Sequence, residues 1–328
     1  MAPAALNNSS KTVCVMDASG RLGSALVHRI LQRGYTVHAA VHNHDELQCY
    51  ERESTENNKL SVFHLDPLDY HSILDALKGC CALFYSFELP SYHPTYDEWM
   101  GELEVRAAHN VLEACAQTDT IDKVVFTSSA TAVIWRDHQH DDIPSDMDER
   151  NWSDVNFLKK FKSSNFKVLD DVGKFLIAGL WHGLSKTIAE KTAWALAMDR
   201  GVNMVSINGG LLTCPDLSVK DPYLLGAAKM FKDGVFVTVD LKFLVDAHIC
   251  VFEDPSSYGR YLCFNRTINS SDDAVKLATI MLPSSSSSPS SGTSEEDRYY
   301  YQQRISNGKL SKIMVDFESG CQISNNHE

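Results

Sequence analysis

The sequence predicts an α/β protein in which a doubly wound parallel sheet carries a smaller C-terminal lobe. Three observations lead to this expectation. Up to residue 210, short apolar runs alternate with stretches of helical period, as in repeated strand–helix–strand units. A turn containing two glycines joins the first apolar run to the first helical stretch. Beyond residue 210 the elements become shorter and mixed, as expected of a small lobe on the sheet's C-terminal edge.

The predicted strands and helices follow one another in a regular order. The apolar runs expected to form strands span residues 11–17, 35–41, 60–66, 81–87, 123–129 and 203–209. The stretches of helical period span residues 22–34, 70–78, 104–118 and 180–194, and Gly34 ends the first of them. Right-handed crossovers between such elements produce a parallel sheet with helices on both faces.

These elements divide the chain into two expected units, the main one covering residues 11–210. Residues 211–315 are expected to form the smaller lobe, with a short strand and helix within 235–254 and another strand at 259–265. An irregular stretch at 161–179 precedes the helix of 180–194. Composition predicts disorder in three places, residues 1–10, 284–297 and 316–328.

Charge and cysteine usage exclude some classes of function. The 328 residues carry a formal net charge of −13, which argues against a nucleic-acid-binding protein. Nine cysteines are scattered without a CxxC pair or zinc-type spacing, which favours reduced thiols and a cytoplasmic protein. The N-terminal residues lack the apolar segment of a signal peptide. No apolar run approaches the length of a membrane span, so no membrane association is expected.

The first strand–helix junction resembles a dinucleotide-binding turn of the Rossmann type. The template places glycines at positions 17, 20 and 23, and this chain has Gly20 and Gly23 but Asp17. Gly20 would let the backbone approach a pyrophosphate, and Gly23 would let the helix pack closely on the sheet. A turn that binds nothing is the alternative. The residues expected to contact the cofactor here are Ser19, Gly20, Arg21, Leu22 and Gly23.

The end of the second strand indicates which cofactor is bound. NAD sites place an acid there for the ribose 2′-hydroxyl, whereas NADP sites place a base for the 2′-phosphate. This chain has His42 at that end, and its acids come only later. NADP(H) is therefore the expected cofactor. His38, His42 and His44 also suggest a metal site, but they lack a cysteine or carboxylate partner at ligand spacing, so no metal is expected.

His182 and Lys186 lie four residues apart in the helix of 180–194 and so share one of its faces. They are a catalytic pair or two surface residues, and their spacing alone leaves both interpretations open.

Several blocks taken together resemble a known family, the extended short-chain dehydrogenase/reductases of plants. The cinnamoyl-CoA reductase-like group is the most similar, and dihydroflavonol reductases are its relatives. The resemblance covers roughly residues 11–282 and 299–315. The blocks that carry it are Gly20–Gly23, KVVFTSSA (123–130), DERNWSD (148–154), LWHGLSKTIAEKTAW (180–194), INGGLL (207–212) and VDLKFLVDAHICVFEDPSSYGRYLC (239–263).

The resemblance implies an NADP(H) domain, a substrate lobe and a Ser/Tyr/Lys catalytic set. Ser129 matches the serine that hydrogen-bonds the substrate carbonyl, and Lys186 matches the lysine that binds the nicotinamide ribose and lowers the pKa of the acid. His182 stands where the family has its tyrosine. Asp66 matches a residue that contacts adenine. Gly210 and Leu211 match the turn that meets the nicotinamide.

The chain also departs from the family pattern at other positions. Asp17, Phe87 and Gly209 replace a glycine, a small residue and a proline. Ile134 replaces the asparagine that dihydroflavonol reductases use, and the Asn-Trp-Tyr-Cys-Tyr run of true cinnamoyl-CoA reductases is absent. The segment 161–179 is about seventeen residues longer than the resemblance implies. It is either a real insertion or an artefact of the gene model.

Two functions follow from these matches and departures. The first is NADP-dependent reduction of a small-molecule carbonyl compound, an aldehyde, ketone or CoA thioester, by Ser129, His182 and Lys186. The second is a nucleotide-binding, regulatory protein on the same fold with impaired catalysis. The sequence does not decide the substrate or the oligomeric state.

Overall fold

A seven-stranded sheet forms the centre of the protein, and every neighbouring pair of its strands is parallel. The computed structural model describes residues 11–42, 58–88, 96–136, 146–162, 171–214, 217, 221, 223–281 and 299–324. The strands follow the order β3-β2-β1-β4-β5-β6-β9. Their bounds are Thr12–Met16 (β1), Thr36–Val41 (β2), Leu60–His64 (β3), Ala82–Tyr85 (β4), Lys123–Ser129 (β5), Met204–Gly209 (β6) and Gly259–Cys263 (β9).

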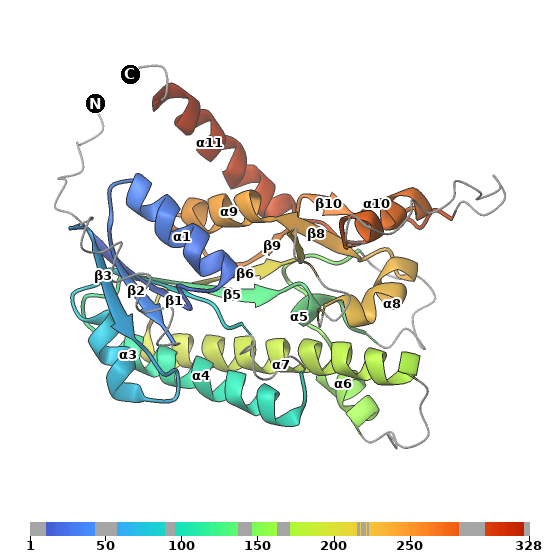
Figure 1. The fold of residues 1–328 in the computed structure, drawn as a ribbon, viewed down its shortest axis with the longest axis horizontal. Helices are drawn as coiled ribbons and strands as arrows, with labels where there is room; N and C mark the ends of the chain where they lie inside the picture. The colour runs from blue at the N-terminus through green and yellow to red at the C-terminus, as the bar shows by residue number, and fades with distance from the viewer. Residues whose placement is uncertain are drawn as a thin grey trace.

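Helices cover both faces of this sheet (Figure 1). One face carries α1 (Arg21–Gln32), α9 (Leu241–Glu253) and α11 (Gly308–Ser324). The other carries α3 (Tyr70–Leu77), α4 (Glu98–Ala116) and α7 (Asp171–Arg200). Alternate residues of β1 separate the two cores, because Val13 and Val15 pack with α1 whereas Cys14 and Met16 pack with α3 and α4. The fold class expected from the sequence is confirmed.

A smaller lobe lies beyond the carboxyl ends of β5 and β6. It contains a second sheet of order β10-β8-β7, made of β7 (Leu211–Thr213), β8 (Val237–Asp240) and β10 (Arg266–Thr267). Short helices share a hydrophobic core with that sheet: α5 (Thr131–Ile134), α6 (Val155–Lys162), η3 (Leu224–Gly226), α8 (Ala227–Lys232) and α10 (Ser271–Met281). Trp135, which is 1% exposed, is one of the largest side chains of the core here.

The two units do not divide the chain at residue 210. The strand expected at 259–265 joins the main sheet as β9, beside β6, instead of the lobe. The helix before it, α9, packs against the main sheet with α1. The chain therefore leaves the sheet after β6, builds part of the lobe, and returns. Strand order in a sheet depends on contacts between distant segments, which local patterns do not report.

Several helices also differ in length from the expected ones. α4 begins at Glu98 because the Asp97 carboxylate caps it, accepting a hydrogen bond from Met100 N at 2.9 Å. α7 begins at Asp171, so residues 171–179 of the expected insertion are helical. α11 continues to Ser324, so the expectation of a disordered tail is wrong for residues 316–324. Leu310 and Met314 anchor this helix in the core. Residues 1–10, 163–170 and 284–297 lie outside the described residues.

In the described ranges, none of the helices is both long and apolar enough to cross a bilayer.

His248 lies on the buried face of α9 and contacts the sheet, as its position in an apolar run suggests. Its Nδ1 lies 2.7 Å from the Leu244 carbonyl oxygen and its Nε2 lies 2.9 Å from Thr127 Oγ1. Since Nδ1–H donates to the carbonyl, Nε2 accepts from the threonine hydroxyl. Burial lowers the pKa of His248 from 6.5 to about 4. The side chain is therefore neutral in the folded protein at neutral pH.

We expect His248 to make the folded state sensitive to acid. The unfolded chain binds a proton at this residue near pH 6.5 and the folded chain only near pH 4, so stability falls as pH falls between these values. The contribution is about 3 kcal/mol in full. His248→Gln should flatten the slope of unfolding free energy against pH, measured by urea titration.

His28→Gln is the matched control for this measurement. His28 makes the same bond to the carbonyl four residues before it, at 2.7 Å, but on the exposed face of α1. The His28→Gln variant should keep the wild-type slope of unfolding free energy against pH. A His248→Gln profile that overlays the wild type would contradict the argument.

Candidate active site

Ser129 is the last residue of β5 and lies where the chain leaves the main sheet and enters α5. It is 6% exposed. Its Oγ accepts hydrogen bonds from the Thr131 backbone amide at 3.2 Å and from the Thr131 hydroxyl at 2.9 Å. The chain turns into α5 at this point, and the two bonds hold the serine at the turn.

His182 lies on α7 and faces the same turn. Its Nδ1 is 3.3 Å from Thr131 Oγ1, so one hydroxyl group links it to Ser129. The ring of Tyr96 packs edge-on against the imidazole with centroids 4.8 Å apart, and Tyr223 lies at 6.5 Å. Burial, and then the charge of Lys186, lower the pKa of His182 well below its usual value. The imidazole is therefore neutral at neutral pH.

Lys186 is one turn farther along α7 and is held by a buried acid. Its Nζ lies 2.7 Å from Glu104 Oε1 and donates to the Phe87 carbonyl at 3.1 Å. Glu104 is 3% exposed. The hydroxyls of Ser185 and Tyr96 donate to its other oxygen at 2.7 and 3.1 Å. The ammonium group is thus drawn to the carboxyl end of β4 and away from bulk water.

The turn between β1 and α1 has the close packing that its glycines predict. A Cβ added to Gly23 would lie 2.0 Å from the Asp17 carbonyl oxygen, so no side chain fits there. Asp17 has a φ of 58°, a left-handed conformation that favours glycine and that aspartate tolerates better than most residues. Ser19 is partly exposed, and Leu22 turns its side chain into the core. Arg21 is exposed and donates to Cys214 Sγ at 2.9 Å.

Glu88 approaches the N-terminus of α1 from the end of β4. A Cβ on Gly20 would lie 3.0 Å from its carboxyl carbon and 2.9 Å from Asp17 Oδ2. Desolvation raises the pKa of Glu88, although the charges of Arg21 and Lys186 and the backbone amides of Leu22 and Arg21 lower it. The carboxylate lies at the positive end of the α1 dipole, the position at which helices bind anions.

The remaining expected contacts lie at carboxyl ends of strands. His42 follows β2 and is exposed, and its Nδ1 lies 3.2 Å from the Leu65 carbonyl oxygen. Asp66 follows β3, and its carboxylate accepts from Leu68 N at 2.9 Å. The two residues are therefore neighbours beside the β1–α1 turn. His44 lies outside the described residues.

Gly210 and Leu211 follow β6, where the chain enters the lobe. A Cβ on Gly210 would lie 2.8 Å from the Val237 carbonyl oxygen, so the glycine allows β6 and β8 to approach each other. Leu211 is buried in the core of the lobe. In this structure its side chain packs in that core.

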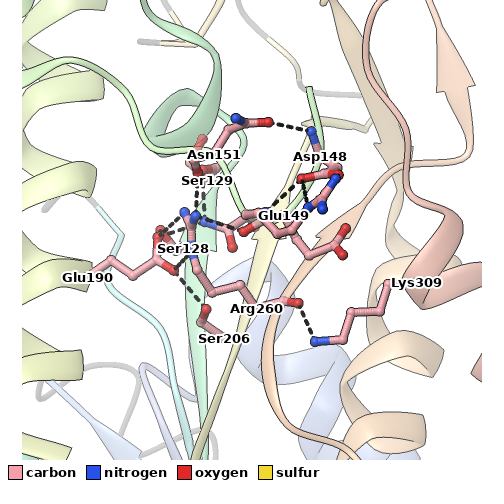
Figure 2. Close-up of polar contacts among 11 residues, drawn as sticks. Ser128, Ser129, Asp148, Glu149, Asn151, Glu190, Ser206, Arg260 and Lys309 are labelled. Atoms are coloured by element: carbon pink, nitrogen blue, oxygen red, sulfur yellow. Dashed lines mark hydrogen bonds and ion pairs between the residues drawn. The ribbon is translucent and has the colours of Figure 1, made fainter. Parts of the chain in front are cut away.

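A buried ion pair between Glu190 and Arg260 ties this region together (Figure 2). Glu190, on α7, is fully buried, and Arg260 Nε on β9 donates to its Oε1 at 2.8 Å. Ser206 donates to Oε1 at 2.7 Å, and Ser128 and Asn208 donate to Oε2 at 2.8 and 2.7 Å.

The network also reaches Ser129 and the segment that precedes α6. Asn208 Nδ2 donates to the Ser129 carbonyl oxygen at 3.3 Å. Arg260 donates to the carbonyls of Glu149 and Asn151, and its guanidinium lies 3.6 Å from the ring centroid of Trp152. The strand end that presents the serine is therefore fixed to α7 through buried polar groups.

The structure brings together the residues that the sequence singled out, and adds others. Ser129, His182 and Lys186 converge, and the glycine turn, His42 and Asp66 lie along the same edge of the sheet. Thr131, Glu104 and Glu88 were not predicted. A signal for Glu104 exists, because an acid interrupts the apolar stripe of α4 between Met100 and Ala107. Thr131 and Glu88 have no local pattern that distinguishes them from ordinary loop and helix residues.

Comparison with known proteins agrees with this geometry. The family profile described as NAD(P)H-binding matches residues 18–155. Cinnamoyl-CoA reductase 1 of Petunia hybrida is 33% identical over 274 residues, covering 80% of this chain and 75% of that protein. The chain belongs to the cinnamoyl-CoA reductase-like extended short-chain dehydrogenase/reductases. It is an NAD(P)-dependent oxidoreductase by that membership.

This oxidoreductase is also similar to another curated reductase in sequence and to two solved structures in fold. The bifunctional dihydroflavonol 4-reductase/flavanone 4-reductase of Malus domestica is 30% identical, over 79% of this chain and 73% of that protein. Vestitone reductase from alfalfa superposes with a TM-score of 0.63 at 22% identity, covering 92% and 91% of the two chains. Yeast methylglyoxal/isovaleraldehyde reductase Gre2, in complex with NADPH, superposes with a TM-score of 0.64 at 14% sequence identity, and the match covers 93% of each chain.

The nucleotide turn of this oxidoreductase keeps two of the glycines that dinucleotide sites use, Gly20 and Gly23. Gly23 gives the close helix packing, and the backbone at Gly20 is open except for the carboxylates beside it. Glu88 has a long, exposed side chain, so its rotation removes one of these carboxylates and leaves that of Asp17 beside Gly20. The residues present therefore fit a nicotinamide cofactor.

We expect the buried pair of this oxidoreductase to control its stability. Glu190→Ala should lower the free energy of unfolding by about 3–5 kcal/mol, because Arg260 would remain buried without its counter-charge. Urea unfolding at neutral pH measures the change. Lys229→Met, which breaks the more exposed Lys229–Asp233 pair on α8, should lower it by about 0–1 kcal/mol. Equal losses in the two variants would contradict the assignment.

Proposed function

We propose that this protein reduces a small carbonyl compound, an aldehyde, ketone or CoA thioester, with NADPH. The observation that carries the proposal is the convergence of Ser129 with His182 and Lys186 at the sheet edge that also holds the glycine turn. Open α/β sheets bind their ligands outside the carboxyl ends of the strands, which is where these groups lie.

The proposed cofactor contacts run along this edge. The pyrophosphate would lie on the turn of residues 19–23, with the adenine beside Asp66 and the 2′-phosphate near His42. The absence of an acid at the end of β2 favours NADP over NAD. Gly210 and Leu211 would border the nicotinamide. Lys186 uses two of its three ammonium hydrogens for Glu104 and Phe87, which leaves one for the ribose.

In the proposed reaction the cofactor, Ser129, His182 and a water molecule each have a separate role. NADPH, when bound, supplies the hydride that reaches the carbonyl carbon. Ser129 would donate a hydrogen bond to the carbonyl oxygen and stabilise the negative charge that develops there. His182 is neutral and too weak an acid to supply the balancing proton by itself, so a water molecule would deliver it. His182 would instead orient the hydroxyl groups around the serine.

Turnover is the direct test of this function. The full chain should oxidise NADPH in the presence of at least one member of a panel of aldehydes, ketones and CoA thioesters. Ser129→Ala should lower kcat/KM about a hundredfold or more, since it removes the donor to the developing charge. A wild type that turns over no faster than Ser129→Ala would refute the reductase. Tight NADPH binding without turnover would then support the nucleotide-binding alternative.

We also expect Glu88 to weaken cofactor binding. Its carboxylate competes with the pyrophosphate for the α1 N-terminus, so Glu88→Gln should bind NADPH about tenfold more tightly at neutral pH. Because the pKa of Glu88 is raised, wild-type affinity should increase as pH falls and Glu88 becomes protonated. Fluorescence titration of NADPH across pH measures both effects.

Comparing the NADPH affinities of Glu88→Gln and the wild type at each pH separates the effect of Glu88 from that of other groups that titrate in the same range. Glu102→Gln, on the exposed face of α4, is the control and should change neither affinity nor its pH dependence. Identical affinities for Glu88→Gln and the wild type at every pH would show that Glu88 does not oppose the cofactor.

A further inference from the structure

Thr131 lies between Ser129 and His182, the two side chains that the proposed reduction requires together. Its hydroxyl donates to Ser129 Oγ at 2.9 Å and lies 3.3 Å from His182 Nδ1. Thr131 is 1% exposed. Its carbonyl oxygen accepts a hydrogen bond from Ser153 Oγ at 2.8 Å. Both its side chain and its backbone are therefore held in place at the start of α5.

The direction of the bond from Thr131 to Ser129 sets the direction of the bond between Thr131 and His182. A threonine hydroxyl carries one hydrogen, so a hydroxyl that donates to Ser129 accepts from His182. The imidazole then carries its proton on Nδ1. Burial keeps the ring neutral by lowering the pKa of His182, so one nitrogen holds a proton and the other does not.

Counting donors and acceptors in the same way shows what the Ser129 hydroxyl can still offer a substrate. Its oxygen accepts the Thr131 amide at 3.2 Å and the Thr131 hydroxyl, and a hydroxyl oxygen has two acceptor sites. What Ser129 retains for a substrate is its own hydrogen. A carbonyl oxygen needs a donor of that kind.

We propose that Thr131 is a positioning residue that directs the Ser129 hydroxyl at the substrate carbonyl and couples it to His182. The inference rests on the proposed reductase function. It also explains how an imidazole serves at position 182. An imidazole nitrogen reaches less far from its helix than a phenol oxygen does, and the Thr131 hydroxyl spans the remaining distance from the α5 side.

Removal of the hydroxyl tests this assignment. Thr131→Val keeps the shape of the side chain and frees the Ser129 oxygen to accept other bonds, so kcat should fall about ten- to hundredfold. KM and NADPH affinity should stay within about threefold, because Thr131 is buried and would act on the substrate only through Ser129. Thr131→Ser restores a hydroxyl at the same atom and should recover most of kcat.

The matched control is Thr187→Val on α7. Thr187 is also fully buried, and its hydroxyl donates to the Gly183 carbonyl oxygen within the helix. The same chemical change there should leave kcat near the wild-type value. Thermal unfolding of each variant checks that the fold survives. Should Thr131→Val fail to fold, Thr131→Ala provides the same comparison without added bulk.

A second readout does not depend on turnover. Proton–nitrogen spectra of protein carrying isotope-labelled histidine report which ring nitrogen of His182 is protonated, with its signal assigned by loss in His182→Asn. The wild type should show the proton on Nδ1, and Thr131→Val should shift it toward Nε2. A wild-type proton on Nε2 would overturn the proposal.

The outcomes separate this proposal from the proposed function. A wild type that reduces carbonyl compounds, with Thr131→Val equally active, overturns the role of Thr131 and leaves the reductase standing. A wild type that reduces none of them refutes the reductase, and the position of the His182 proton then decides whether the coupling through Thr131 exists. A loss of kcat rescued by serine, with the proton on Nδ1, supports both.

Discussion

The buried ion pair of Glu190 and Arg260 is the constraint on which the rest of the structure depends. A fully buried carboxylate is tolerated only when its charge and its hydrogen-bonding capacity are both satisfied. Here α7 supplies the acid, β9 the base, and β5 and β6 the hydroxyl and amide donors. Four separate elements must therefore meet at one point. The position of α7 against the end of β5 follows from that meeting.

That position matters because one stripe of α7 carries the ionisable groups of the candidate site. His182, Lys186 and Glu190 follow one another at intervals of four residues, so they line one side of the helix. All three are largely withdrawn from water, and each is accommodated in a different way. The histidine stays neutral, the lysine is paired with Glu104, and the glutamate with Arg260. A shift of the helix by one turn would separate each of them from its present partner.

Local pattern in the sequence was enough for the architecture but not for these pairings. Alternating apolar runs and helical periods predicted the parallel sheet, since each element's own residues bury one of its faces. The glycines at 20 and 23, Ser129 and Lys186 could be found because a turn or a family motif marks them. β9 was assigned to the wrong unit, and Glu104 and Thr131 were not found. Their roles come from residues that lie far away along the chain or on another element, and no local period records such contacts.

The separation of Glu190 from Arg260 by seventy positions also bears on how the protein is made. A chain emerging from the ribosome presents α7 well before it presents β9. During that interval the glutamate has no counter-charge, so water must keep access to it and the helix cannot settle fully onto the sheet. β9, the last strand of the main sheet to be made, therefore completes the ion pair, and the candidate site takes its final form only after most of the polypeptide has been synthesised.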